Sequence, residues 1–168
     1  MARRVEELED FPFVVVSPQC PIGTLRHLQL TTLRGLLDEV MERHAVDSDR
    51  VYLTGLSMGG YGVWHLAAKH PERFAAVVPI CGGGLASQGF PDKVCALKDV
   101  PVWAFHGADD EVVPLSESRR LCERLRECGG KVELTVYQGV GHDSWTRTYE
   151  NPRVFEWLLE HRLSDRKG

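Results

Sequence analysis

One serine of the chain has neighbours that could make it a nucleophile. Ser57 is the centre of residues 55–59, Gly-Leu-Ser-Met-Gly, which lie between the apolar run Val51–Leu53 and a stretch with helical character. In a nucleophile elbow, a sharp strand-to-helix turn holds the serine hydroxyl above the end of a sheet. Side chains in place of Gly55 or Gly59 would collide with the neighbouring strand and helix, so we expect glycine to be needed at both positions. The alternative is a glycine-rich turn with an idle serine.

A serine hydroxyl becomes a nucleophile when a base accepts its proton and a carboxylate orients that base. His142 lies in the segment GVGHDSW after the last predicted strand, and Asp110 lies in HGADDEVVP after the strand before it. The chain order Ser57, Asp110, His142 differs from the orders of chymotrypsin and subtilisin. We favour Asp110 as the acid, although it could instead cap the next helix, as Asp109 or Glu111 also could. A surface-loop histidine is the alternative for His142.

These residues have complementary chemical roles. His142 would take the Ser57 proton as the hydroxyl attacks an ester carbonyl, while Asp110 would fix the imidazole tautomer and stabilise the imidazolium. The amide of Met58 points toward the place where an oxyanion forms, which makes it one candidate donor. Trp145, three residues after the base, either lines the substrate pocket or anchors its loop as a core aromatic. The set predicts a serine hydrolase that works through an acyl-enzyme.

We expect no metal and no cofactor. The cysteines form no C-x-x-C pair and no Cys/His cluster with zinc spacing. An odd number of cysteines without an export signal favours free thiols in a reducing compartment. His106, at the end of a predicted strand, is interpreted as a structural residue that closes the strand. The five cysteines are Cys20, Cys81, Cys95, Cys122 and Cys128.

Length and composition favour one domain over residues 1–168, with a net charge of −4. Because Lys and Arg form no basic stripe, nucleic acid is not an expected partner, and a small-molecule ester substrate fits better. The apolar run Phe13–Val16 is too short for a signal-peptide core or a membrane span. We therefore expect no membrane association, and the cytoplasm is favoured if Met1 is the natural start.

Strand-like and helix-like segments alternate along the chain. This alternation predicts a three-layer α/β/α sandwich with a mostly parallel sheet of about five strands and right-handed crossovers. Ligands of such sheets bind at the carboxyl ends of the strands, where the candidate triad lies. The predicted strands are Phe13–Ser17, Val51–Thr54, Ala75–Ile80, Val102–Phe105 and Val132–Tyr137, and the predicted helices cover about 33–41, 61–70, 116–127 and 152–161.

Three segments need separate comment. The continuous apolar character of Phe13–Ser17 is typical of a strand buried on both faces. The glycine-rich stretch 82–98 could cover the pocket, but we favour a mobile surface loop. Val132–Tyr137 alternates apolar with polar residues, which predicts an edge strand with one solvated face.

The segments that carry the motifs resemble one family of enzymes. They are FPFVVVSPQCP, DRVYLTGLSMGGYGVWHLAAKHPERFAAVVPICGGG, PVWAFHGADDEVVP and GVGHDSWTRTYENP. Over most of the chain they look like the phospholipase/carboxylesterase-like and predicted-peptidase branch of the α/β-hydrolases, near dienelactone-hydrolase and feruloyl-esterase relatives. The resemblance implies a serine carboxylesterase active on small or aryl esters, with Ser57, Asp110 and His142 as the triad and Met58 as an oxyanion donor. The family's acid follows the histidine of an HG motif by four residues, which again selects Asp110.

The resemblance fails at the start of the sequence. Family members have further strands there and an H-G-x-G-type loop that supplies the second oxyanion amide, whereas only residues 1–10 precede the FPFVVVSP run. One hypothesis is that Phe13–Ser17 moves beside Val51–Thr54, so that the amide of Gln19 or Cys20 becomes the donor. The other is that a second copy of the chain supplies or covers the open sheet edge, giving a homo-oligomer.

Three functions follow from the sequence. The leading one is a serine carboxylesterase. A peptidase or amidase could use the same triad, although no segment marks a peptide-binding cleft. The third is a catalytically weak, truncated hydrolase domain that binds a ligand or associates with itself.

Overall fold

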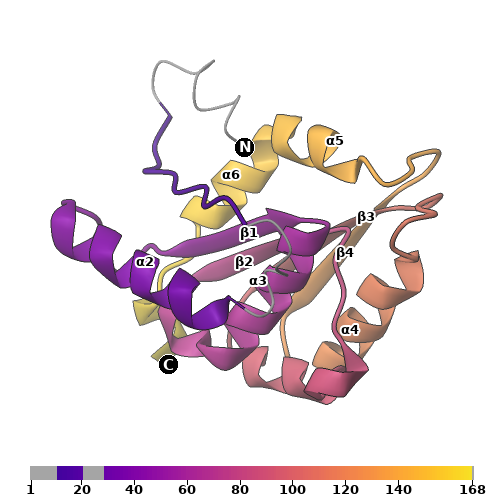
Figure 1. The fold of residues 1–168 in the computed structure, drawn as a ribbon, viewed down its shortest axis with the longest axis horizontal. Helices are drawn as coiled ribbons and strands as arrows, with labels where there is room; N and C mark the ends of the chain where they lie inside the picture. The colour runs from indigo at the N-terminus through magenta and orange to yellow at the C-terminus, as the bar shows by residue number, and fades with distance from the viewer. Residues whose placement is uncertain (1–10, 21–28, 168) are drawn as a thin grey trace.

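A parallel sheet lies at the centre of the molecule. The computed structural model describes residues 11–20 and 29–167, and Figure 1 shows four strands in the order β1-β2-β3-β4. Every neighbouring pair is parallel. The predicted α/β class is confirmed, with four strands in the described residues instead of about five. The strands are β1 (Tyr52–Leu56), β2 (Ala76–Ile80), β3 (Val102–Gly107) and β4 (Val132–Tyr137).

Helices cover both faces of this sheet (Figure 1). On one face lie α2 (Leu30–Arg43), α3 (Met58–Lys69) and α4 (Leu115–Glu127), and on the other lie α5 (Ser144–Glu150) and α6 (Pro152–Leu159). Successive side chains of a strand point to opposite faces, so Val77 packs with the first group and Val78 with the second. β2 is buried throughout, whereas β1 is only half-buried. The elbow strand is thus an edge of the described sheet.

α4 illustrates how the sequence positions a helix below the site. Its buried residues Leu121, Cys122 and Leu125 form an apolar stripe at helical spacing, while charged side chains occupy the outer face. Gly129 adopts a left-handed conformation with φ of 80° and ends the helix, since only glycine adopts that conformation without strain. The predicted end of this helix is confirmed.

α5 was not among the predicted helices, although a local signal for it exists. The side chain of Asp143 accepts hydrogen bonds from the N–H and the hydroxyl of Thr146, both at 3.1 Å, which caps the first turn. With seven residues, the helix is too short for a clear hydrophobic period. Because α5 begins at Ser144, it supports the loop that carries His142.

The segment Phe13–Ser17 is not a strand. It has no regular secondary structure and pairs with no strand, so its predicted position beside Val51–Thr54 is wrong. Val14 and Val16 are 65% and 45% exposed, which also contradicts burial on both faces. Alternate side chains of the segment face inward, and these anchor it near α6 through ring contacts instead of backbone pairing.

The anchoring of this segment can be measured. The Phe13 ring lies 5.8 Å from that of Tyr52 and 6.2 Å from that of Phe155, centroid to centroid. We expect Phe13→Ala to lower the free energy of unfolding by about 1–2 kcal/mol, because the ring is only partly buried. The exposed Val14→Ala is the matched control, with a change below about 0.5 kcal/mol. Equal urea midpoints for the two variants would show that the segment is not anchored.

The stretch 82–98 is part of the core and not a mobile surface loop. It contains two short 3₁₀ helices, Ala86–Gln88 and Asp92–Leu97. Phe90, Val94 and Leu97 are at most 5% exposed and pack with residues of α3 and α4. Burial of these three apolar side chains therefore fixes the segment in the core, although its glycine-rich composition is typical of a loop.

Two of the five cysteines are joined, which corrects the expectation of free thiols. Cys95 and Cys128 form a disulfide whose Cα atoms are 5.5 Å apart, within the usual range. The fold brings the second 3₁₀ helix beside the end of α4, a contact across 33 residues of sequence that spacing alone does not predict. Cys20, Cys81 and Cys122 are outside this bond.

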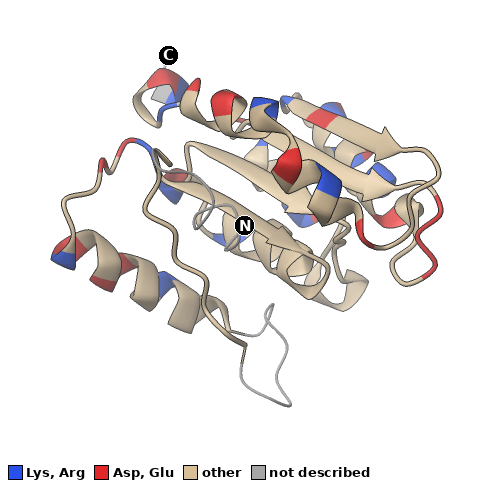
Figure 2. Cartoon of the chain, turned by 90° about the horizontal axis from the view of Figure 1, so that it is seen from above, with Lys and Arg blue, Asp and Glu red and all other residues tan. Residues whose placement is uncertain are grey.

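Positively and negatively charged residues are interspersed along the elements of the fold (Figure 2). On α2, Arg34 pairs with Asp38, and on α6, Arg153 pairs with Glu156 at 3.0 Å. Such exposed pairs contribute about 0–1 kcal/mol each and do not determine the fold. Among the described helices, none is both long and apolar enough to cross a membrane.

Candidate active site

Ser57 stands on a strained turn between β1 and α3. Its φ of 50° and ψ of −118° are rare for a residue with a side chain. A Cβ added to Gly55 would lie 2.6 Å from the carbonyl oxygen of Gly59, so the backbones cross too closely for any side chain there. The local geometry is that of a nucleophile elbow.

The second close approach involves a different glycine from the one expected. A Cβ on Gly59 would meet nothing within 4 Å, so the expected collision at that position is absent. A Cβ on Gly60 would lie 2.5 Å from the oxygen of Ile80 and 2.9 Å from Cα of Gly82. The first turn of α3 thus packs on the loop after β2, which fixes the direction in which the elbow points.

The structure brings the three candidate triad residues together. Nε2 of His142 lies 2.9 Å from Oγ of Ser57, and Nδ1 lies 2.8 Å from Oδ2 of Asp110. These distances are ordinary hydrogen bonds and fall within the reach of a general base. Ser57 follows β1, Asp110 follows β3 and His142 follows β4, so all three lie at the carboxyl ends of the strands. No hydrogen bond joins Asp109 or Glu111 to His142 in the described structure.

Asp110 is held as a carboxylate. Burial alone would raise its pKa, but hydrogen bonds from His142 and from the N–H groups of Val113 and Val112 outweigh burial and hold the pKa below its ordinary value. Both N–H groups donate to Oδ1 at 2.9 Å, which leaves Oδ2 for His142. Pro114 occupies the N-cap of α4, so Asp110 stabilises its own loop and does not cap that helix.

His106 is a residue whose position the sequence interpretation missed. It is fully buried, and its Nε2 lies 2.9 Å from the carbonyl oxygen of Val113 and 3.2 Å from Oδ2 of Asp110. Its Nδ1 lies 2.8 Å from Oγ of Ser118. One feature of the sequence indicates this contact. His106 lies at the end of the strand that Asp110 follows, four residues before Asp110. It contacts Asp110 directly, which the interpretation of His106 as a structural residue at the strand end did not include.

A buried thiol lies beneath the nucleophile. The N–H of Ser57 donates to the oxygen of Ile80 at 3.0 Å and lies 3.3 Å from Sγ of Cys81. Burial raises the pKa of Cys81 to about 11, so the thiol is protonated at neutral pH. Potential metal-ligand atoms of Cys81, Asp110 and His142 lie within 4.8 Å of one another. Oδ2 of Asp110 and both ring nitrogens of His142 are already engaged in hydrogen bonds with each other and with Ser57.

Met58 and Trp145 lie next to the triad. Met58 is the first residue of α3, so its N–H belongs to the first turn, where amides have no partner within the helix. The Trp145 ring stands edge-on to the His142 ring, with centroids 5.3 Å apart, and packs against the core beneath α5. Trp145 thus contacts the base and the core, and its role toward substrate stays a prediction.

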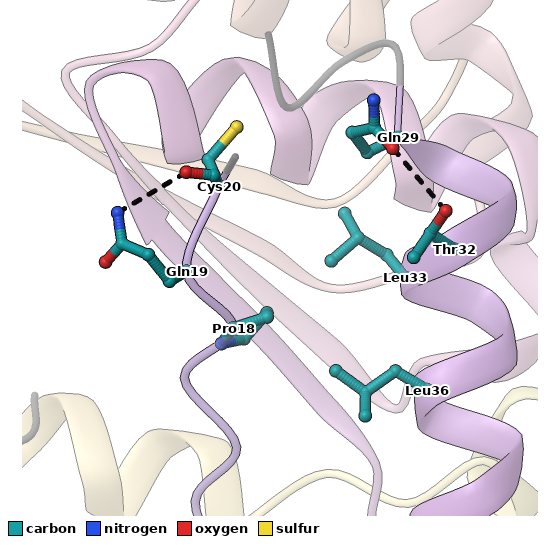
Figure 3. A pocket seen from close by; sticks show the side chains of 7 residues that line it. All are labelled: Pro18, Gln19, Cys20, Gln29, Thr32, Leu33 and Leu36. Carbon is teal, nitrogen blue, oxygen red and sulfur yellow. Dashed lines mark hydrogen bonds between the residues drawn. The ribbon is translucent and has the colours of Figure 1, made fainter. Parts of the chain in front are cut away.

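Gln19 and Cys20 lie in a groove between the N-terminal segment and α2. With Pro18 and side chains of α2 they line a space of about 110 Å³. In Figure 3, Leu33 and Leu36 point from α2 toward the N-terminal segment, while the Gln19 side chain turns away from the helix. Without strand pairing of Phe13–Ser17 to β1, the proposed route that carries their amides to the oxyanion is lost. The α2 side of the groove consists of Gln29, Thr32, Leu33 and Leu36.

Comparison with known proteins supports the same interpretation of the fold. The family described as Phospholipase/Carboxylesterase matches residues 26–155. The crystal structure of a thermostable esterase superposes with a TM-score of 0.79 and 40% identity, covering 86% of this chain and 43% of that one.

Curated relatives are more distant and longer. A Salmonella typhimurium protein named "Putative carboxymethylenebutenolidase" is 30% identical over 104 residues, which are 60% of this chain and 38% of that protein. A bifunctional acetylxylan esterase/xylanase of Neocallimastix patriciarum is 26% identical over 92 residues, 55% of this chain and 13% of that protein. The chain spans less than half the length of each.

Proposed function

Because this chain belongs to the phospholipase/carboxylesterase family, we propose that it is a serine carboxylesterase. It hydrolyses small or aryl carboxylic esters through Ser57, His142 and Asp110. The observation that carries the proposal is the pair of hydrogen bonds at 2.9 and 2.8 Å that link the serine hydroxyl to the imidazole and the imidazole to the carboxylate. The esterase names of similar proteins favour the same substrate class.

The proposed reaction has two halves. Ser57 Oγ attacks the ester carbonyl while Nε2 of His142 accepts its proton, and the protonated imidazole then gives that proton to the leaving alcohol. Water attacks the resulting acyl-serine, with His142 again as the base, and releases the acid. Asp110 keeps the Nδ1 proton in place and stabilises the imidazolium in both halves. This chemistry needs no cofactor.

The oxyanion site sets the rate that we expect. Met58 N–H is one proposed donor, and Gln19 or Cys20 stays a candidate for the second without a demonstrated route. Loss of one oxyanion donor costs about 2.7–4 kcal/mol of transition-state stabilisation, or about 10²–10³ in kcat. An enzyme with Met58 alone would therefore be a slow esterase and would still turn over.

The test is hydrolysis of p-nitrophenyl acetate, together with labelling by a serine-directed phosphonate. We expect turnover, and a mass increase located on Ser57 by peptide analysis. Labelling of Ser57 without turnover would favour the weak, truncated hydrolase instead. Absence of both would contradict the assignment of Ser57.

A second proposal is self-association through the edge of the sheet. In the described residues, no strand pairs with the outer edge of β1, and a half-buried edge strand is a template for association. We expect the sedimentation coefficient to rise with protein concentration. A strictly monomeric profile at high concentration would remove this proposal and leave the esterase proposal untouched.

A further inference from the structure

The triad acid has a second imidazole partner. Oδ2 of Asp110 lies 2.8 Å from Nδ1 of His142 and 3.2 Å from Nε2 of His106, and the side chains of Asp110 and His106 are both 0% exposed. Oδ1 of the same carboxylate is occupied by two backbone N–H groups. The hydrogen bonds of Asp110 in the described structure come from its own loop and from His142, while Nε2 of His106, which also bonds to the oxygen of Val113, makes a close polar contact with Oδ2.

The surroundings of His106 define where its proton resides. Nε2 faces two groups that can only accept, the carbonyl oxygen of Val113 at 2.9 Å and the carboxylate of Asp110 at 3.2 Å. Nε2 must therefore carry the proton. Nδ1 faces the hydroxyl of Ser118, which can donate to it and can alternatively donate to the oxygen of Gly82 at 3.3 Å. The tautomer is fixed by the fold.

No other charged group competes for this imidazole in the described residues. On α4, the nearby carboxylate of Glu117 is engaged with Arg120 at 2.8 Å and with the N–H of Gly84 at 3.4 Å. On the loop after β4, His142 contacts the same oxygen, Oδ2, of Asp110. Asp110 is therefore the charged group that the His106 imidazole contacts.

We propose that His106 is a positioning residue of the hydrolytic site. Its Nε2–H holds Oδ2 of Asp110 in the orientation that His142 requires, so that neither oxygen of the carboxylate is free to turn. This inference rests on the proposed function. The N–H of His106 also partly neutralises the negative charge on Oδ2. Oδ2 therefore attracts the Nδ1 proton of His142 less strongly. A purely structural histidine would affect stability without changing the hydrogen bond between His142 and Asp110.

Two substitutions at His106 separate these roles. His106→Gln keeps an N–H near the place of Nε2 and loses only the Nδ1 contact, because Ser118 can then donate to Gly82. His106→Asn keeps a polar group toward Ser118 and leaves Oδ2 of Asp110 without its second donor. We expect His106→Asn to lower kcat about tenfold with KM unchanged within about twofold, and His106→Gln to stay within about threefold of wild type.

A measurement without substrate completes the test. In NMR spectra, we expect the resonance of the Nδ1 proton of His142, which Oδ2 of Asp110 accepts, to move downfield in His106→Asn, because Oδ2 then carries more charge, and to stay near its wild-type position in His106→Gln. Ser118→Ala is the control, since it perturbs the same buried region but keeps the N–H near Asp110. It should lower the unfolding temperature and leave that resonance in place.

Each outcome decides one question. An unchanged Nδ1 proton resonance of His142 in His106→Asn, with a kcat that follows stability alone, would overturn the positioning role. An equal shift of that resonance in His106→Asn and Ser118→Ala would also overturn it. If wild type hydrolyses no ester, the proposed function fails, whereas the resonance still decides whether His106 acts on His142.

Discussion

Replacing Ser57 with alanine is expected to lower kcat for p-nitrophenyl acetate by about 10⁴- to 10⁶-fold, or about 5–8 kcal/mol of barrier. The reason is that, among the residues that the structure describes, we identify no other nucleophile able to take its place. The nearest alternative, the thiol of Cys81, is fully buried, and its pKa is raised to about 11, so almost no thiolate exists at neutral pH. Steady-state kinetics with burst analysis measures the effect.

The control for this variant is Ser116→Ala, an exposed serine of α4. It should retain wild-type kcat and KM. Comparable rates for Ser57→Ala and wild type would contradict the nucleophile assignment. Because the alanine variant keeps the backbone amide of Met58, any residual rate above the uncatalysed reaction reports what the oxyanion site contributes alone.

The second large effect is expected for Asp110→Asn, which should lower kcat by about 10⁴-fold. Oδ2 of Asp110 accepts the Nδ1 proton of His142 at 2.8 Å, while Oδ1 is fixed by backbone N–H groups. The amide oxygen of asparagine would stay on those N–H donors, so its NH₂ group would face Nδ1. His142 would then hold its proton on Nε2, where the base must be free.

The neighbouring carboxylates provide matched controls for this substitution. Asp109→Asn and Glu111→Gln change the charge of the same loop equally and should keep kcat within about threefold of wild type. A larger loss in either than in Asp110→Asn would transfer the role of the acid to that residue.

Stability should follow the same carboxylate. Since the folded state lowers the pKa of Asp110, its charge contributes stability above the ordinary value of 3.8, and that contribution is lost as pH falls below it. The difference in unfolding free energy between wild type and Asp110→Asn should therefore shrink below about pH 4. Urea unfolding at pH 7 and pH 3 measures this.

The sequence predicted the parts of the molecule that local patterns determine. Ser57, Asp110 and His142 were predicted because each follows a strand at the same sheet edge, and parallel topology brings those ends together. Four of the five strand segments were correct within about two residues. The apolar runs of these strands lie between residues typical of turns and helices. Tertiary contacts therefore shift the ends of the strands only slightly.

The remaining features depend on contacts that no local pattern contains. Phe13–Ser17 has the composition of a strand, but its rings pack near α6 and its valines face solvent. The bond between Cys95 and Cys128 depends on where a 3₁₀ helix meets the end of α4. His106 contacts Asp110 only because the loop after β3 folds back on its own strand.

The position of β1 at the sheet edge has a consequence for thermal behaviour. Ser57 follows this half-buried strand, while Asp110 and His142 follow β3 and β4. Edge elements open by local fluctuations that cost less free energy than global unfolding. We therefore expect opening of β1 to withdraw the proposed nucleophile while His142 and Asp110 stay assembled. On heating, turnover should then be lost at a temperature at which circular dichroism still reports a folded domain.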